Sequence, residues 1–378
     1  MPLASRLLRT LRFSALLPFL LATSAAAQST QEVPFDSPRW EIRGQEHRVE
    51  EYLGRQSLKL RGGFAIVRDA DLTDGVIEFD MAFPPDRGFK GALWRYESPG
   101  NWEEFYVRPH QSGNPDANQY TPAFFGNTAW QLYYGEGYGA PVRYQYNTWT
   151  RIRIVVAGKR AEVYIGDMTK PALVTHEMKR SIRGGPVGVQ VANFSPAWYS
   201  RFRFTPMSTP PALVGPPPKP VPPPAGAVMA WRISDAFDEK SLETKFQLSP
   251  ADQAARTWTT LPAESSGITN LASVQPVTEA KNTAFARITI TSDRDQVKKI
   301  RFGFSDRVKV YFNGTLLYGG QDNYTSRDYR FLGTMGLFDE LYLPLKRGEN
   351  ELWFAISEDF GGWGIIAHFP DASGIAWK

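Results

Sequence analysis

Apolar and polar residues alternate along much of the chain, in short runs separated by turn-forming residues. In the run VIEFDMAF, Ile77 and Phe79 would share one face of a strand, while Glu78 and Asp80 would share the other. The runs WTRIRIVV, AEVYI and SRFRF repeat this alternation. A period of two, interrupted by turns, is typical of β-sandwiches and β-barrels. Residues 33–206 are therefore predicted to form an all-β domain.

The last part of the chain shows the same period. In VKVYFNGTLLY, Asn313 and Gly314 stand between two alternating runs, which is a strong sequence signal for a β-hairpin. ARITI, KIRFGF, LYLPL and ELWFAI add further short strands. Trp353 and Trp363 could serve as platforms for sugars, but they are interpreted as residues that pack or brace a sandwich core. We predict a second all-β domain over residues 228–378.

A proline-rich stretch, residues 207–227, separates the two parts and contains the run STPPALVGPPPKPVPPPAGA. Proline lacks an amide N–H, so this density excludes a helix or an inner strand and favours extended polyproline II. Such a spacer extends by about 3.1 Å per residue. The predicted architecture is all-β, with two β-sandwich (jelly-roll) domains joined by a Pro-rich linker.

Residues 1–27 have the pattern of an export signal. Three arginines precede an apolar run at 13–21, and Ala25-Ala26-Ala27 forms a cleavage site. The apolar run is shorter than the roughly 20 residues that cross a bilayer, and no later segment is apolar enough to do so. The mature protein is therefore expected to be exported, as a periplasmic or secreted protein.

Composition narrows the classes of partner and of stabilisation. The chain has no cysteine, so its domains must be held by their cores rather than by disulfides. Its formal net charge of +4 comes largely from the three arginines of the export signal, and no basic run follows. Nucleic acid is therefore not an expected partner. No oligomeric state follows from the sequence.

Aromatic and hydrogen-bonding residues are concentrated between 103 and 139. On a strand, Glu104, Tyr106, Arg108 and His110 would share one face. Rings can pack against the apolar faces of sugars, and carboxylate, guanidinium and amide groups can bond their hydroxyls. The predicted ligand-binding residues are Glu104, Tyr106, Arg108, His110, Asn118, Gln119, Tyr120, Trp130, Gln131, Tyr133 and Tyr134. For each of them, a place in an aromatic core or on its polar outer face remains the alternative.

The first domain resembles the concanavalin A-like lectin/glucanase superfamily, including its laminin G-like and 3-keto-disaccharide hydrolase-like members. The resemblance covers most of 35–206 and is carried by GVIEFDM, FYVRPHQSGNPDANQYTP, WQLYYGEGY, WTRIRIVVAGKRAEVYI and GPVGVQVANFSPAWYSRFRF. The second domain resembles galactose-binding-like jelly rolls through DRVKVYFNGTLLYGG and LPLKRGENELWFAISEDFGGWG. These resemblances imply two β-sandwiches and a carbohydrate as the partner.

The laminarinase-type members of this superfamily carry a Glu-x-Asp strand that ends in a further glutamate. Glu78 and Asp80 match its first two positions, but Ala82 and Phe83 stand where the last carboxylate would be. Retaining hydrolysis needs two carboxylates about 5 Å apart. Glu78 and Asp80 are therefore interpreted as a solvated strand face.

Three functions remain open. A carbohydrate-binding protein is favoured, and it requires no catalytic residue. The alternative enzyme would be a 3-keto-glycoside hydrolase or lyase, in which Glu104 and His110 could move protons. The third alternative is a structural interaction module.

No cofactor is expected. The oxygen-bearing residues Asn114, Asp116 and Asn118 of NPDAN would suit calcium, but turns favour the same residue types for backbone reasons. The scattered histidines have no zinc-site spacing.

Overall fold

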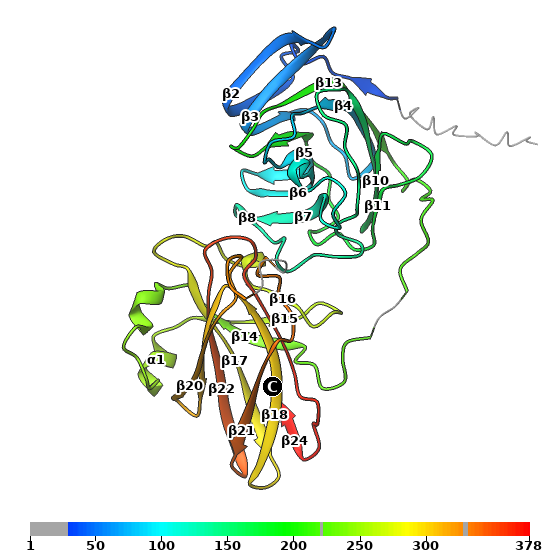
Figure 1. Ribbon diagram of the computed structural model, residues 1–378. Helices are drawn as coiled ribbons and strands as arrows, with labels where there is room; N and C mark the ends of the chain where they lie inside the picture. Colours follow the sequence, from blue (N-terminus) through cyan, green and yellow to red (C-terminus); the bar gives the residue numbers. More distant parts are fainter. Residues whose placement is uncertain (1–28, 220–221, 328–331) are drawn as a thin grey trace, which may run out of the picture.

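The structure is a computed structural model that describes residues 29–219, 222–327 and 332–378. Its regular elements are almost all β-strands, grouped in two bodies that lie against each other (Figure 1). The predicted all-β class is confirmed. The predicted export signal lies outside the described residues. None of the helices in the described part of the chain has the length and hydropathy that crossing a membrane requires.

The first body is a single antiparallel sheet that curls around its own core. Its strands are β1 (Gln31–Glu32), β2 (Trp40–Tyr52), β3 (Arg55–Val67), β4 (Asp74–Ala82), β5 (Lys90–Ser98), β6 (Asn101–Val107), β7 (Asn118–Phe124), β8 (Asn127–Thr128), β9 (Thr150–Ala157), β10 (Arg160–Ile165), β11 (Leu173–Thr175), β12 (Val187–Val191) and β13 (Ala197–Met207). Along the sheet the order runs β11-β10-β9-β4-β13-β3-β12-β5-β6-β7-β8, with β1 beside β13 and β2 beside β3.

The alternation on β4 places its apolar face in the core, where Ile77 and Phe79 are almost completely buried. The sequence interpretation of its opposite face as solvated was wrong. Glu78 accepts hydrogen bonds from arginines of the neighbouring strands β9 and β13. Asp80, which is 8% exposed, pairs with Arg55 of β3 at 2.5 Å. Long guanidinium side chains therefore cover both carboxylates, which the period of two alone could not show.

The second body has two antiparallel sheets. One contains β14 (Ala230–Ser234), β15 (Trp258–Pro262), β17 (Thr283–Ser292), β19 (Arg307–Phe312), β20 (Thr315–Gln321), β22 (Gly348–Ser357) and β24 (Ile375–Trp377), and the other contains β16 (Thr269–Asn270), β18 (Gln296–Ser305), β21 (Asp339–Leu345) and β23 (Gly364–His368). Trp363 lies fully buried in the main core, and Trp353 lies in a smaller apolar cluster. Both tryptophans pack the domain, as predicted. The short helix α1 (Pro250–Ala254) lies at the surface of this body.

The predicted hairpin is formed by β19 and β20. Its two turn residues, Asn313 and Gly314, have φ values of 48° and 82°. Positive φ at both central positions is the geometry of a type I′ turn, which matches the twist of the flanking strands. The Asn-Gly pair is therefore explained by backbone conformation.

Gly314→Ala should lower the free energy of unfolding by about 1–2 kcal/mol, because an L-residue is strained at this φ. Gly319→Ala is the matched control in the same hairpin. A Cβ there would meet its nearest atom only at 3.9 Å, and Gly319 has no positive φ. Thermal unfolding of both variants measures the difference. Equal effects would contradict the turn assignment.

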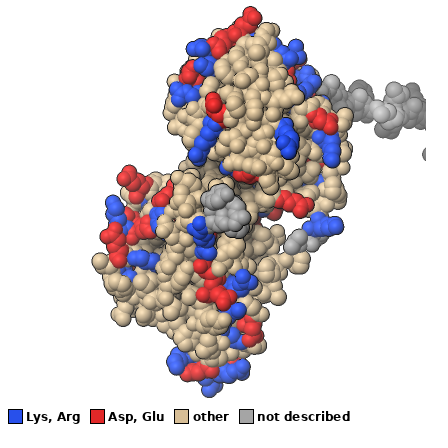
Figure 2. Space-filling view, in the orientation of Figure 1, with Lys and Arg blue, Asp and Glu red and all other residues tan. Residues whose placement is uncertain are grey.

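The two bodies meet through the loop that follows β8. Its buried apolar residues Ala129, Leu132 and Tyr133 pack with Met335 of the second body. The backbone N–H of Gln131 donates to the Gly361 carbonyl at 2.8 Å, and the backbone N–H of Met335 donates to the Gln131 carbonyl at 2.9 Å. Backbone hydrogen bonds combined with an apolar cluster fix the second body against the first. The face shown in Figure 2 carries Lys and Arg interspersed with Asp and Glu rather than one extended basic patch.

Candidate functional site

A cleft of about 640 Å³ opens where the two bodies meet. Its lining in the first body comes from β6, β12 and the segment before β5, and loops of the second body close one side. Half of its lining residues are aromatic. The aromatic residues that line it are Phe89, Trp102, Tyr106, Trp130, Phe194, Tyr324 and Phe360. Arg87, Glu104, Arg108 and Gln190 supply charged and amide groups.

The alternation along β6 determines which of its side chains reach the cleft. Phe105 points into the sandwich core and is fully buried there. Trp102, Glu104 and Tyr106 take the opposite face and line the cleft. Trp102 is held by its neighbours, since it lies 6.0 Å from the ring of Tyr96 in a stacked arrangement. The strand thus presents a carboxyl group between two rings; the shared face of Glu104 and Tyr106 was predicted from the sequence, but Trp102 was not.

Glu104 is the buried acidic group of the cleft. It is 4% exposed, and its Oε2 accepts a hydrogen bond from Trp102 Nε1 at 2.7 Å. Burial raises the pKa of Glu104 to about 7, and the indole hydrogen bond opposes this only partly. The group therefore changes charge near neutral pH. It can donate a proton or a hydrogen bond below that pH and can accept one above it.

Arg108 follows the end of β6 and also reaches the cleft. Its guanidinium pairs with Asp116 at 2.5 Å and lies 5.5 Å from the ring centroid of Phe89. Asp116 belongs to the NPDAN stretch, which forms a turn. This carboxylate is engaged by an arginine. Within residues 29–219, 222–327 and 332–378, no group of three or more His, Cys, Asp or Glu side chains could hold a metal ion.

His110 does not share a strand face with Glu104. Strand β6 ends at Val107, and His110 lies in the 3₁₀ turn Pro109–Gln111. Its ring is 5.7 Å from that of Phe89, and it does not line the cleft. Burial and the nearby arginines lower the pKa of His110 to about 4. The proline after Arg108 ends the strand, so the expectation of one continuous face was wrong at this residue.

Three more predicted residues are buried inside the first body. Tyr120 is 1% exposed, and its hydroxyl donates to Glu103 Oε2 at 2.6 Å on the core side of the sheet. The Asn118 side chain donates to Ala140 O at 2.9 Å, and Gln119 donates to a backbone carbonyl of the following loop. None of the three lines the cleft. Their polar groups hold the loop in place.

Gln131, Tyr133 and Tyr134 make contacts between the two bodies. The Gln131 side chain donates to Asp306 Oδ1 at 3.2 Å, and the Tyr133 hydroxyl donates to Glu264. Tyr134 donates to a backbone carbonyl of the second body at 2.7 Å. These residues do not line the cleft. Of the predicted set, Glu104, Tyr106, Arg108 and Trp130 are the residues that the structure brings together there.

The second body contributes cleft residues that sequence reasoning missed. The ring of Phe360 lies 6.4 Å from that of Trp130 and 5.2 Å from that of Tyr324. Phe360 and Tyr324 are both exposed large hydrophobic residues. Phe360 precedes Gly361 and Gly362, whose φ values of 107° and 146° allow the sharp turn that presents it. An exposed aromatic residue beside a paired-glycine turn was the available signal.

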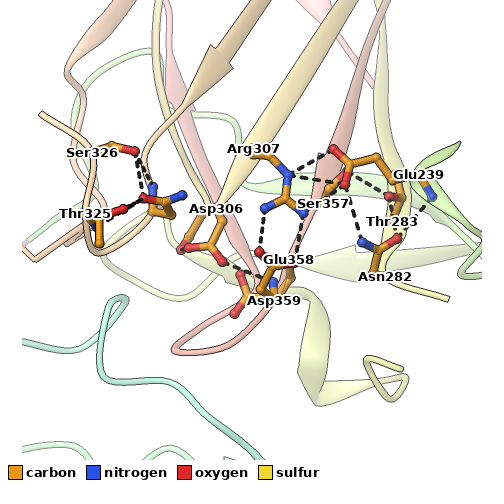
Figure 3. Close-up of polar contacts among 12 residues, drawn as sticks. Glu239, Asn282, Thr283, Asp306, Arg307, Thr325, Ser326, Ser357, Glu358 and Asp359 are labelled. Atoms are coloured by element: carbon orange, nitrogen blue, oxygen red, sulfur yellow. Dashed lines mark hydrogen bonds and ion pairs between the residues drawn. The ribbon is translucent and has the colours of Figure 1, made fainter. Parts of the chain in front are cut away.

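A polar cluster lies beside the cleft at the end of β22 (Figure 3). Arg307 forms ion pairs with Glu239 and Asp359 at 2.8 and 2.7 Å. Asp306 accepts the Asp359 amide N–H at 3.0 Å, and burial raises the pKa of both Asp306 and Glu358. These contacts anchor the loop that carries Phe360.

Comparisons with known proteins give structural likeness only. No family model matches the chain, and none of the curated proteins matches it. The carbohydrate-binding module CBM66 from Bacillus subtilis is 15% identical with a TM-score of 0.34, and the match covers 43% of this chain and 93% of that one. A protein of unknown function with a galectin-like fold, also from Bacillus subtilis, gives 9% identity, a TM-score of 0.36, and coverage of 46% and 94%. A putative beta-glucanase from Mycobacterium abscessus is 12% identical with a TM-score of 0.31, and the match covers 46% of this chain and 98% of that one. At such scores, none of these proteins says what this chain binds.

Proposed function

We propose that the protein is an exported carbohydrate-binding protein that holds a glycan in the cleft between its two domains. The observation that carries this proposal is the composition of the cleft, in which seven rings surround a small number of hydrogen-bonding side chains. Ring faces suit the apolar C–H faces of pyranoses, and Glu104, Arg108 and Gln190 can bond their hydroxyls. A volume of about 640 Å³ is within the range of small-ligand sites.

A glycan panel titrated against the mature chain tests the proposal. Trp130→Ala and Phe360→Ala should each weaken binding about tenfold, because each removes one ring from the cleft, and tenfold equals about 1.4 kcal/mol. Tyr342→Ala is the control, since Tyr342 is 60% exposed on β21 and does not line the cleft. Isothermal titration calorimetry measures all four proteins.

Unchanged affinity in both cleft variants would show that the glycan binds outside this cleft. An inert native chain, tested against neutral and acidic saccharides, would remove the proposal.

The alternative is an enzyme that cleaves keto-glycosides, and one observation favours it. Burial gives Glu104 a pKa of about 7, which suits a general acid or base near neutral pH. Among the described residues, however, no second carboxylate lines the cleft, whereas retaining and inverting hydrolysis both use two. Turnover of a 3-keto-glycoside by the native chain, lost in Glu104→Gln, would establish this activity.

A further inference from the structure

Two guanidinium groups lie at one end of the cleft. The Arg87 guanidinium is 5.1 Å from the ring centroid of Phe194, and the Arg108 guanidinium is 5.5 Å from that of Phe89. These two rings are themselves 5.5 Å apart. Arg87 and Arg108 are therefore joined by a short path of aromatic contacts along the lining of the cleft.

Both arginines have donor capacity left for a ligand. Arg108 uses one terminal nitrogen on Asp116, and its other terminal nitrogen makes no hydrogen bond among the described residues, whereas its Nε is buried. The Arg87 side chain has no carboxylate partner within the part of the chain that the structure describes. A guanidinium carries five N–H donors in a rigid fork that matches planar anions. The unused donors thus favour an anionic group at this end of the cleft.

The acidic side chain in the cleft does not offset these charges at mildly acidic pH. Glu104 is the one acidic residue among the described residues that line the cleft, and burial raises its pKa to about 7. Near pH 6 it is mostly uncharged and donates rather than repels. The described lining is therefore cationic overall under these conditions, because the Arg108–Asp116 pair is neutral and Arg87 keeps its charge.

We propose that the cleft takes an acidic saccharide, with the carboxylate or sulfate of one sugar residue bound by Arg87 and Arg108. The neighbouring sugar rings lie against the aromatic residues that continue from Phe89 towards Trp130. This inference rests on the proposed carbohydrate-binding function and narrows its ligand class. Arg87 sets the preference for charge, and the rings set the affinity for the saccharide itself.

A charge-matched ligand pair tests this inference. Trigalacturonate and its methyl ester have the same rings and differ in their carboxylates. At pH 6 and low salt, the mature full chain should bind the acid at least tenfold more tightly than the ester by calorimetry. Arg87→Gln should reduce this ratio to below threefold, mainly by weakening the binding of the acid. Arg201→Gln is the control, because Arg201 is exposed on the same domain and does not line the cleft.

The outcomes separate the two proposals. If the ester or another neutral saccharide binds through the cleft as tightly as its acidic counterpart, the acidic ligand class is wrong and the carbohydrate-binding function stands. If no saccharide of either kind binds, both proposals fail. If tetraglutamate binds as tightly as trigalacturonate, charge alone is recognised and the saccharide assignment is overturned. If Arg87→Gln leaves the ratio of acid to ester affinity unchanged, Arg87 does not bind the anionic group.

Discussion

Glu104→Gln should remove much of the pH dependence that the native protein shows in its stability between pH 5 and pH 8. Burial raises the pKa of Glu104 to about 7 in the folded state, and an unfolded glutamate titrates near 4.3. Between these values the folded state binds more protons than the unfolded state, so the free energy of unfolding falls as pH rises. Between pH 5 and pH 8 the native protein should therefore lose roughly 3 kcal/mol of its free energy of unfolding through Glu104.

Glutamine suits this test because its side-chain oxygen can still accept the hydrogen bond from Trp102 Nε1. Urea unfolding at pH 5, 6, 7 and 8 should show the variant gaining stability relative to the native chain as pH rises. Glu51→Gln, at an exposed position on β2, should follow the native profile. Parallel profiles for Glu104→Gln and the native chain would mean that Glu104 is charged in the folded state throughout this range.

Glu264→Ala should have the second large effect, because it releases the two bodies from each other. Lys179 Nζ lies 2.6 Å from Glu264 Oε2, and the Lys179 side chain is only 5% exposed. Burial lowers the pKa of Lys179, but Glu264, Tyr138 and Glu177 together more than reverse this shift, with Glu264 the largest of the three. Removing the carboxylate leaves a buried cation poorly compensated, which costs about 2–3 kcal/mol. The Tyr133 hydroxyl loses its acceptor as well.

Glu177→Ala is the matched control, since Glu177 contacts the same Lys179 Nζ at 2.9 Å but is 49% exposed. It should cost less than about 1 kcal/mol. Hydrogen exchange at Gln131 and Met335, whose amides bond across the interface, should accelerate in Glu264→Ala alone. Glycan binding should weaken in the same variant, because Phe360 and Tyr324 leave the cleft. Equal exchange in the two variants would show that this contact does not hold the bodies together.

Alternation along single strands was the most informative sequence signal. It correctly placed Ile77 and Phe79 in the core, and on β6 it separated Phe105 from Glu104 and Tyr106. The turn at Asn313-Gly314 could be predicted because only a few residue types adopt its backbone geometry. Both signals are local, and each depends on residues that are close in sequence.

The candidate site was only partly predictable, because its remaining determinants are not local. Periodicity assigns a residue to a face but does not say what covers that face. Tyr133 is aromatic and polar like Tyr106, yet it lies in the contact between the bodies. There Glu264, which is far away in sequence, accepts a hydrogen bond from the Tyr133 hydroxyl. Phe360 and Tyr324 reach the cleft only when the second body docks. No pattern within the first domain contains that information.

Because the walls of the cleft come from both bodies, ligand occupancy and docking are thermodynamically reciprocal. A glycan that touches Trp130 and Phe360 together strengthens docking by the same factor by which docking strengthens its own binding. By mass action, free ligand at 100 times its Kd would stabilise the closed arrangement by about 2.7 kcal/mol. That gain is comparable to the expected cost of losing Glu264, so a saturating saccharide would largely restore the closed arrangement in a chain with Glu264→Ala.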